Sequence, residues 1–576
     1  MSAQSPSSLP DAAAYAPADS LAFFSFSLDA DSPQWTQASA LGDRLGQPLS
    51  PQILVQSLLE PIVGGMAADE VTKAITSGEL GVAITDPDLA SVLPGVDLSS
   101  GVDPVAIADE VSAVDTSAAS GFVLIGLVPN PDDVAGAINL FINSRAQIAG
   151  EQVETTTYND VAIVSIAAIP DEGFPGIAVA RVDDAIIAAT NPDDLEPVID
   201  VAQGTGESLA DDSTVSQVLE PLPAERLATT IVNGPALAEY AAADPDAAGL
   251  LAPVLSSVNA VTGFAVSAQT AGFQLDLRAA SPNGEPVFGS NDNFDPKLIE
   301  QMPADTQILV DGYDFGAAGV LDVAVAILSN LFLGSLGGMF VPGDFGDEPA
   351  TPEATPAATP VPSLQEAADT AYTTLAFLLG FNLKTDLIAL LDGEYALGVW
   401  GLNGTDPTGA SAAFVSETSD PSTLSSSIGT LIGFLGFGAD QAGVVTGTTR
   451  IGDSTVNSIT VSSLGLPSPL TVGVVNGALA LGLGEDGGTV AVEGSTDSLA
   501  ENPDFIAATS GLPADRNSLL YVDISSLQST IDAGFGTTPM VGADGDVELN
   551  ADSLAIAGFQ DGDMAGAQGM LYIPEQ

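Results

Sequence analysis

The chemistry open to this chain depends on carboxylates, hydroxyls and amides, because its 576 residues include neither Cys nor His. Their absence excludes disulfides, thiol catalysis and any triad or metal site that needs histidine. Glu79 and Glu394 occupy matching positions in the two halves of the sequence, as do Arg226 and Arg516. If the halves face each other, the glutamates could form the carboxylate pair of a glycoside hydrolase. We favour a structural interpretation, in which each glutamate begins a strand after a glycine turn and each arginine pairs with a nearby carboxylate. We therefore predict no catalytic residue.

A glycine motif in the second half has the spacing of a dinucleotide-binding loop. Gly482, Gly484 and Gly487 follow a predicted strand directly. However, Glu485 and Asp486 would stand where a pyrophosphate must approach backbone N–H groups, and the matching loop of the first half has no glycine. We therefore interpret the motif as a tight turn and predict no cofactor.

A run of acidic and amide residues near the C-terminus offers the candidate metal ligands. Asp544, Asp546, Glu548 and Asn550 alternate oxygen ligands as calcium loops do. The run lacks the glycine that an EF-hand loop has at its sixth position, where Leu549 stands. The same alternation is typical of the solvated face of a strand, which we prefer to a calcium site.

The charge balance restricts the partners. The chain carries 76 acidic residues against 10 Lys plus Arg, a formal net charge of −66. A nucleic-acid binder needs clustered Lys and Arg to displace counterions, so nucleic acid and anionic membrane surfaces are excluded as partners. The acidic surface should instead attract cations or cationic partners. The pattern indicates neither a particular ligand nor an oligomeric state.

The beginning of the chain suggests an exported protein. Residues 1–6 contain no basic start and no apolar core of a signal peptide. A Ser/Pro/Ala-rich start, few Lys and no Cys are nevertheless typical of a mature extracytoplasmic protein. We expect a secreted or cell-envelope protein whose leader or anchor is absent from this chain.

Short segments recur in the same order along the two halves. Pro-Ala-Asp-Ser at residues 17–20 returns as Pro-Ala-Asp-Thr at 303–306, and each precedes an apolar strand pattern. Leu-Pro-Ala-Glu-Arg at 222–226 returns as Leu-Pro-Ala-Asp-Arg at 512–516. Ordered matches of this kind indicate an internal duplication.

The duplication predicts two domains, in agreement with a length beyond the ~250–300 residues that one hydrophobic core supports. We place the first lobe at residues 1–288 and the second at 289–576. The second lobe carries an insertion at 342–362 that is rich in Pro, Thr and Ala and is expected to be a flexible surface loop.

Each half contains a hairpin followed by a helix signal. Strand patterns at 177–182 and 185–188 flank Asp183-Asp184, and those at 472–475 and 478–481 flank Asn476-Gly477, which suits a type I′ turn. In the first half Asn191 could cap a helix that Pro192 begins. Helices are also expected after Asn130-Pro131 and Asp420-Pro421. This order of elements predicts an α+β fold with a mostly antiparallel sheet.

One uncharged apolar run, at residues 323–341, is long enough to span a membrane. It contains Ser, Asn and three Gly, and Asp322 and Asp344 bracket it without basic anchors. The matching segment of the first half, residues 35–45, has an ordinary amphipathic pattern. We therefore prefer a buried core helix to a membrane span.

The order of these segments resembles the DUF3352 family of uncharacterised bacterial proteins. The resemblance rests on the Pro-Ala-Asp start at 17–28, the Gly-Glu-Leu-Gly strand at 78–82 and the hairpin-to-helix step at 182–195. It also rests on the segment from Ser498 to Asp523. The resemblance implies an exported or membrane-tethered protein of two tandem α+β copies, and it supplies no reaction, cofactor or site residue.

Together these patterns predict a non-catalytic, two-lobed binding or structural module of the cell envelope. No reactive group stands out in the loops, so we do not expect an enzyme. The alternative is a carboxylate-based hydrolase with its site between the lobes.

Overall fold

The structure, a computed structural model, forms two compact units. Unit 1 consists of Met1–Phe288, Ala507–Pro513 and Glu548–Gln576, and unit 2 of Gly289–Ile506 and Ala514–Val547. The sequence predicts a single division after residue 288, whereas the chain beyond residue 506 contributes to both units. The residues described are 9–55, 78–85, 120–169, 174, 176–243, 260–281, 293–315, 382–403, 409–437, 444–461, 468–528 and 551–574.

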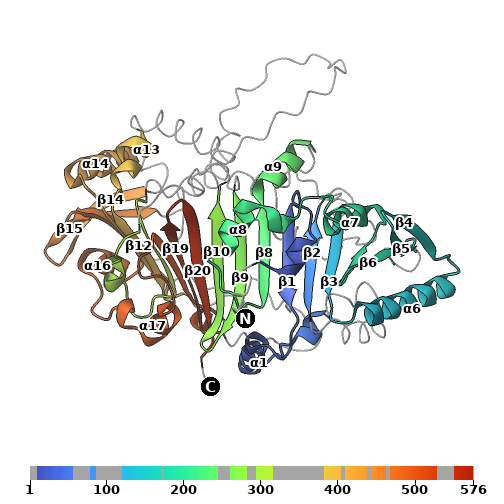
Figure 1. Cartoon of the computed structure of the whole chain (residues 1–576). Helices are drawn as coiled ribbons and strands as arrows, with labels where there is room; N and C mark the ends of the chain where they lie inside the picture. Colours follow the sequence, from blue (N-terminus) through green and yellow to red (C-terminus); the bar gives the residue numbers. More distant parts are fainter. Residues whose placement is uncertain are drawn as a thin grey trace, which may run out of the picture. The chain divides into compact units, whose positions relative to one another are not determined.

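Unit 1 is built on an antiparallel sheet that joins hairpins with pairs of strands that are distant in the sequence (Figure 1). Across the sheet the order is β4 (Glu154–Tyr158), β5 (Val161–Ile166), β6 (Ile177–Val182), β7 (Ala185–Ala189), β3 (Phe122–Leu127), β2 (Glu79–Ile84), β1 (Ala22–Ser27), β8 (Ala228–Asn233), β9 (Val261–Gln269), β10 (Gly272–Ala280), β20 (Met564–Tyr572) and β19 (Ser553–Asp561).

Helices cover both faces of this sheet. Side chains alternate along a strand, so Ile186 and Ile187 of β7 belong to two different buried clusters. The first cluster includes residues of η1 (Asp11–Ala14), α7 (Glu196–Ala202) and α8 (Ser213–Leu219), and the second those of α6 (Pro131–Ala149). The other helices of unit 1 are α1 (Pro33–Leu45), η5 (Asp193–Leu195), η6 (Leu209–Asp211) and α9 (Gly234–Ala243).

Unit 2 has an antiparallel sheet whose strand order matches the order from β4 to β8 in unit 1. The order is β14 (Val444–Ile451), β15 (Ser454–Val461), β16 (Leu470–Val475), β17 (Ala478–Leu483), β13 (Ser411–Glu417), β12 (Glu394–Trp400), β11 (Ile308–Tyr313) and β18 (Ser518–Asp523). Its helices are η7 (Leu298–Gln301), α13 (Leu383–Asp386), η8 (Ile388–Leu390), α14 (Pro421–Phe437), α16 (Gly487–Glu493) and η11 (Leu499–Glu501), followed by α17 (Pro503–Thr509).

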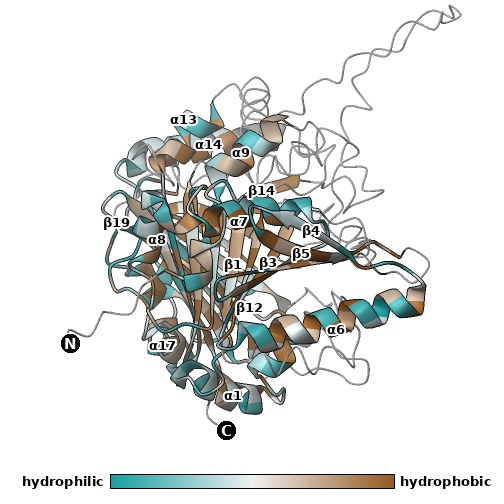
Figure 2. Ribbon diagram, turned by 45° about the vertical axis from the view of Figure 1, so that its right-hand side comes forward, coloured by the Kyte–Doolittle hydropathy of each residue, from teal (hydrophilic) through white to brown (hydrophobic). Residues whose placement is uncertain are grey.

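The predicted α+β fold with antiparallel sheet is confirmed. Both predicted hairpins form, as β6–β7 and β16–β17. Asn476 and Gly477 both have positive φ, 54° and 85°, as a type I′ turn requires. Figure 2 shows that hydrophobic and hydrophilic residues alternate along the ribbon of α6, as in an amphipathic helix.

Two of the three helix starts are as predicted. α6 begins at Pro131 and α14 at Pro421, where the Asp420 carboxylate accepts a hydrogen bond from Thr423 N at 3.0 Å. The cap predicted at Asn191 does not form. The first turn there is the 3-10 helix η5, which begins at Asp193 without a side-chain cap, because it turns the fully buried Leu195 into the core.

Several predictions fall outside the described residues: the apolar run 323–341, the insertion 342–362 and the calcium candidates Asp544, Asp546, Glu548 and Asn550. The counterpart of the apolar run in unit 1 is the amphipathic helix α1, which buries Trp35, Ala38 and Leu41. Within the described ranges, no helix combines the length and apolar character of a membrane span. In the same ranges, no three acidic side chains cluster as metal ligands.

Candidate functional site

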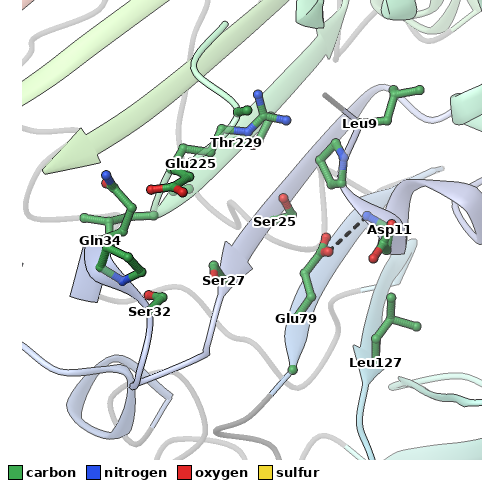
Figure 3. A pocket seen from close by; sticks show the side chains of 17 residues that line it. Leu9, Asp11, Ser25, Ser27, Ser32, Gln34, Glu79, Leu127, Glu225 and Thr229 are labelled. Carbon is green, nitrogen blue, oxygen red and sulfur yellow. Dashed lines mark hydrogen bonds between the residues drawn. The ribbon is translucent and has the colours of Figure 1, made fainter. Parts of the chain in front are cut away.

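A pocket of about 610 Å³ opens at one end of the central strands of the unit 1 sheet (Figure 3). Strands β1, β2 and β8, the start of α1 and the segment before η1 form its walls. Its lining mixes apolar residues with polar ones, and the polar ones are Asp11, Ser25, Ser27, Ser32, Gln34, Glu79, Glu225, Arg226 and Thr229. In Figure 3 the side chains of Ser25 and Ser27 lie along β1, with Glu79 to one side and Glu225 and Gln34 to the other.

Glu79 lines this pocket, and its carboxylate holds the first turn of η1. Its carboxylate accepts hydrogen bonds from Asp11 N at 3.0 Å and Ala12 N at 3.3 Å. The N–H groups at the start of a helix have no partner within the helix, and a carboxylate there also matches the positive end of the helix dipole. Gly81 lets η1 approach β2, since a Cβ there would lie 2.9 Å from Ala12 Cβ. Glu79 is therefore first a structural anchor.

The pairing of the strands brings the polar side chains to one face. Ser27 pairs with Glu79, and Ser25 pairs with Thr229 across β1 and β8. Paired residues of antiparallel strands point to the same face, and residues two apart along a strand share it. This face of β1, β2 and β8 is thus lined by a carboxylate and three hydroxyl groups.

The electrostatics of Glu79 are unusual for a carboxylate. Burial raises its pKa to about 7, against the backbone hydrogen bonds of Ala12 and Asp11 and the charge of Arg226, which lower it. Burial also lowers the pKa of Arg226, whose guanidinium donates to Pro223 O at 3.1 Å. A carboxyl group that titrates near neutral pH in a pocket can hold a proton for a ligand or take one from it.

Two hydroxyl groups of the pocket are placed to meet a ligand. Ser25 and Thr229 are 4% and 2% exposed as whole residues, and both line the pocket, so that their hydroxyl groups are within reach of a molecule bound there. Trp35 is connected to the pocket through Ser27, because its indole Nε1 donates to Ser27 O at 2.6 Å and Ser27 lines the pocket. Gln34 is engaged with β9 through Ala268 N, at 2.7 Å from its Oε1.

Unit 2 repeats the anchor but not the pocket lining. Glu394, 4% exposed, accepts hydrogen bonds from Lys297 N at 2.6 Å and Leu298 N at 2.5 Å, at the start of η7. It pairs with Tyr313, as Glu79 pairs with Ser27. The Tyr313 ring contacts Phe294, with 5.5 Å between ring centroids. Aromatic rings thus lie beside the second glutamate, where unit 1 has a serine.

Asp311 takes in unit 2 the position that Ser25 has in unit 1. It lies two residues before Tyr313 and pairs with Leu519 of β18. It is fully buried, and neither of its carboxylate oxygens has a hydrogen-bond partner among the described residues. Burial, and then the charge of Glu394, raise its pKa to about 8, while the charge of Arg516 lowers it. Asp311 is therefore protonated at neutral pH.

The residues predicted from the sequence thus have a structural role. Glu79 and Glu394 begin β2 and β12, as predicted, and each arginine lies within electrostatic reach of the glutamate of its own unit. Sequence reasoning missed Ser25, Thr229 and Asp311. The signal available was the alternation of Phe and Ser in residues 23–27, together with an aspartate at the matching position of the second half.

The glycine motif forms the turn between β17 and α16. Gly484 has a φ of +88°, and a Cβ on Gly482 would lie 2.3 Å from Gly488 Cα. A Cβ on Gly487 would lie 2.3 Å from Ala412 O, while Glu485 and Asp486 are exposed. The glycines therefore serve the close packing of helix on strand.

Comparisons with known proteins give a family and little more. A family model described as "Protein of unknown function (DUF3352)" matches residues 76–547. No curated protein matches the chain. Among solved structures, one titled "Structure of crystal form I of TP0453" is similar at 9% sequence identity and a TM-score of 0.23. That match covers 49% of this chain and 81% of the other.

Proposed function

The chain belongs to the DUF3352 family, and we propose that it is a non-catalytic, two-lobed binding protein of the cell envelope. In this proposal unit 1 holds a small polar molecule in the pocket beside Glu79. The family carries no described activity, so the proposal rests on the chemistry of the pocket.

The observation that carries the proposal is the pair of hydroxyl groups at Ser25 and Thr229, which lie side by side on paired strands in the lining of the pocket. Few, well-placed polar groups of this kind fix the orientation of a ligand in small-molecule sites. Here they open into a cavity of about 610 Å³, within the size range of small-molecule sites. A polar ligand would form hydrogen bonds with them.

Composition supports the remaining parts of the proposal. The absence of Cys and His removes the commonest nucleophiles and bases, which favours binding over catalysis. A formal net charge of −66 suits an extracytoplasmic, highly solvated surface that attracts cations or cationic partners.

We also infer that units 1 and 2 descend from a duplicated ancestor. The strand order from β4 to β8 in unit 1 corresponds to that from β14 to β18 in unit 2. In both, a glutamate at the start of a strand holds a 3-10 helix. These correspondences support the ordered sequence matches as remains of one event.

Fluorescence of Trp35 provides the test. The chain has two tryptophans, one in each unit, so the variant Trp400→Phe reports on unit 1 alone. Titration with a panel of small sugars, amines, amino acids and organic acids should give saturable changes for one class. Thr229→Val should weaken binding about tenfold or more, as expected for loss of one buried hydrogen bond.

Thr230→Val is the matched control, because Thr230 is on the same strand and faces the other side of the sheet. It should bind as the parent does. No saturable binding by any class, or equal weakening in both variants, would contradict a ligand site in this pocket.

The second candidate is a carboxylate-based hydrolase, which the pKa of about 7 at Glu79 favours, because a general acid works best near the operating pH. Glu225 lines the same pocket and would be the second carboxylate. This function requires turnover of glycosides or esters that Glu79→Gln abolishes. Unchanged turnover in Glu79→Gln would remove it.

A further inference from the structure

The same position in the two sheets carries a serine in unit 1 and a carboxylic acid in unit 2. Ser25 and Asp311 each lie two residues before the partner of the anchoring glutamate. Around that position unit 1 has the pocket, whereas in unit 2 the Asp311 side chain is fully buried. Unit 2 thus shows what chemical group this site of the fold accepts.

The surroundings of the Asp311 carboxyl group have counterparts in the unit 1 pocket. The charges of Glu394 and Arg516 both act on Asp311. Their counterparts, Glu79 and Arg226, both line the pocket. A group bound beside Ser25 would therefore meet the same acid and the same guanidinium.

Unit 1 is also better equipped with hydrogen-bond donors than unit 2. Asp311 pairs with the apolar Leu519, and its oxygens have no hydrogen-bond partner in the described part of the chain. Ser25 pairs with Thr229, so a carboxylate in the pocket would face two hydroxyl donors. Hydrogen bonds to a charged acceptor are roughly twice as strong as those between neutral groups.

We propose that the ligand of the unit 1 pocket is a small organic carboxylic acid, whose carboxyl group occupies the place that the Asp311 side chain takes in unit 2. This rests on the proposed binding function and adds the chemical class of the ligand. Ser25, Thr229 and Arg226 would contact the carboxyl group, and the rest of the cavity would hold its carbon chain.

The charged groups of the pocket couple ligand binding to the uptake of a proton. The charged groups that line it are Asp11, Glu79, Glu225 and Arg226. A ligand carboxylate beside Glu79 favours the protonated form of Glu79, since two adjacent carboxylates share one proton. Binding should therefore take up a proton above pH 7 and weaken as the pH rises. The negative net charge should make added salt strengthen the binding.

The experiment is a titration of Trp35 fluorescence in the full chain carrying Trp400→Phe. The probe is propionate, with propionamide and propylamine as matched neutral and cationic probes. Propionate should bind at least about tenfold more tightly than either, and about tenfold more tightly at pH 6 than at pH 8. Ser25→Asp should abolish propionate binding, because it supplies the carboxyl group internally.

The reciprocal variant in unit 2 keeps the proposal testable if Ser25→Asp fails to fold. Asp311→Ser should lower the melting temperature of unit 2, followed through Trp400 in the Trp35→Phe variant. Propionate, but not propionamide, should raise it again. Preferential binding of propionamide or propylamine would overturn the ligand class while leaving the binding function standing. Absence of binding by all probes and by the wider panel would overturn both.

Discussion

The Glu79 site of unit 1 and the Glu394 site of unit 2 share a frame and differ in what fills it. In both, the glutamate accepts two backbone N–H groups at the start of a 3-10 helix, and an arginine lies within electrostatic reach. In unit 1 serines line the adjoining space and a pocket remains. In unit 2 Tyr313 and Asp311 stand at those positions.

The difference separates scaffold from function. The glutamate is kept because the first turn of the helix needs an acceptor, which holds whether or not a ligand binds. The residues at positions 25 and 311 are not required by the frame, because one is a small hydroxyl and the other a buried acid. A ligand site in this fold should therefore be sought beside the anchor and not in the anchor itself.

The largest expected effect is the loss of the buried anchor in unit 2. Glu394→Ala leaves two backbone N–H groups without an acceptor and should cost about 3–5 kcal/mol of unfolding free energy. Glu79→Ala should cost less, about 1–3 kcal/mol, because solvent in the pocket can reach the freed groups. Urea unfolding followed by Trp400 or Trp35 in single-tryptophan variants measures each unit. Glu485→Ala, in an exposed turn, is the control, and equal losses in the two units would contradict the comparison.

The next effect is a pH dependence of unit 2 that the Asp311 carboxyl group causes. The folded pKa of Asp311, about 8, exceeds its ordinary value of 3.8, so its contribution to stability is complete below pH 4 and is lost as pH rises to 8. Asp311→Asn changes the unfolding free energy of unit 2 at each pH. This change should be more favourable at pH 9 than at pH 4 by roughly 2–4 kcal/mol.

Thermal unfolding from pH 4 to 9, followed through Trp400, checks this. Ser25→Ala in unit 1 should leave the pH dependence of the Trp35 signal unchanged. A pH dependence of unit 2 that persists in Asp311→Asn would show that the buried acid does not cause it.

A smaller effect concerns the approach of the 3-10 helix to the sheet. Gly81 pairs with Ser25, and the corresponding partner of Asp311 is Ala396. Gly81→Ala places a Cβ 2.9 Å from Ala12 Cβ and 3.0 Å from the Phe23 ring, so it should cost unit 1 about 1–3 kcal/mol. Ala396→Gly should cost unit 2 only about 1 kcal/mol. Denaturant midpoints measure both, and a stabilised Gly81→Ala would refute the tight approach.

The smallest effect tests the exposed charge around Arg516. Asp295 is exposed and its charge acts on Arg516, whereas the corresponding position of unit 1 is the uncharged Leu9. Asp295→Asn should cost unit 2 no more than about 0.5 kcal/mol. The cost should vanish in 1 M salt, and a cost that salt leaves unchanged would point to a packing effect.

The sequence predicted those parts of this site that depend on local pattern. The hairpins at Asp183 and Asn476 and the helices after Asn130 and Asp420 follow from turn and cap chemistry over a few residues. The matching of the two glutamates followed from the ordered segments that the two halves of the sequence share. Ser25 and Thr229 could not be recognised, because a serine or threonine that alternates with apolar residues is typical of a solvated strand face. They come together because β1 pairs with β8, which lies about 200 residues later in the chain, and no local pattern predicts that pairing.

The calcium candidates Asp544, Asp546, Glu548 and Asn550 lie outside the described residues, so the structure adds nothing to them. The alternative, in which Glu79 and Glu394 converge between the lobes, stays a hypothesis. Within unit 1, Glu79 and Glu225 line the same pocket.

The placement of the last two strands has a consequence for how the protein is made. β20 pairs with β10, so a strand that ends at Tyr572 completes a sheet that begins near residue 22. A ribosome releases these strands last, after the whole of unit 2 has been synthesised. Until then β10 presents an unpaired edge, which is the kind of surface that invites aggregation and chaperone binding. We expect nascent chains truncated before residue 551 to be held by chaperones, with release coupled to the end of translation.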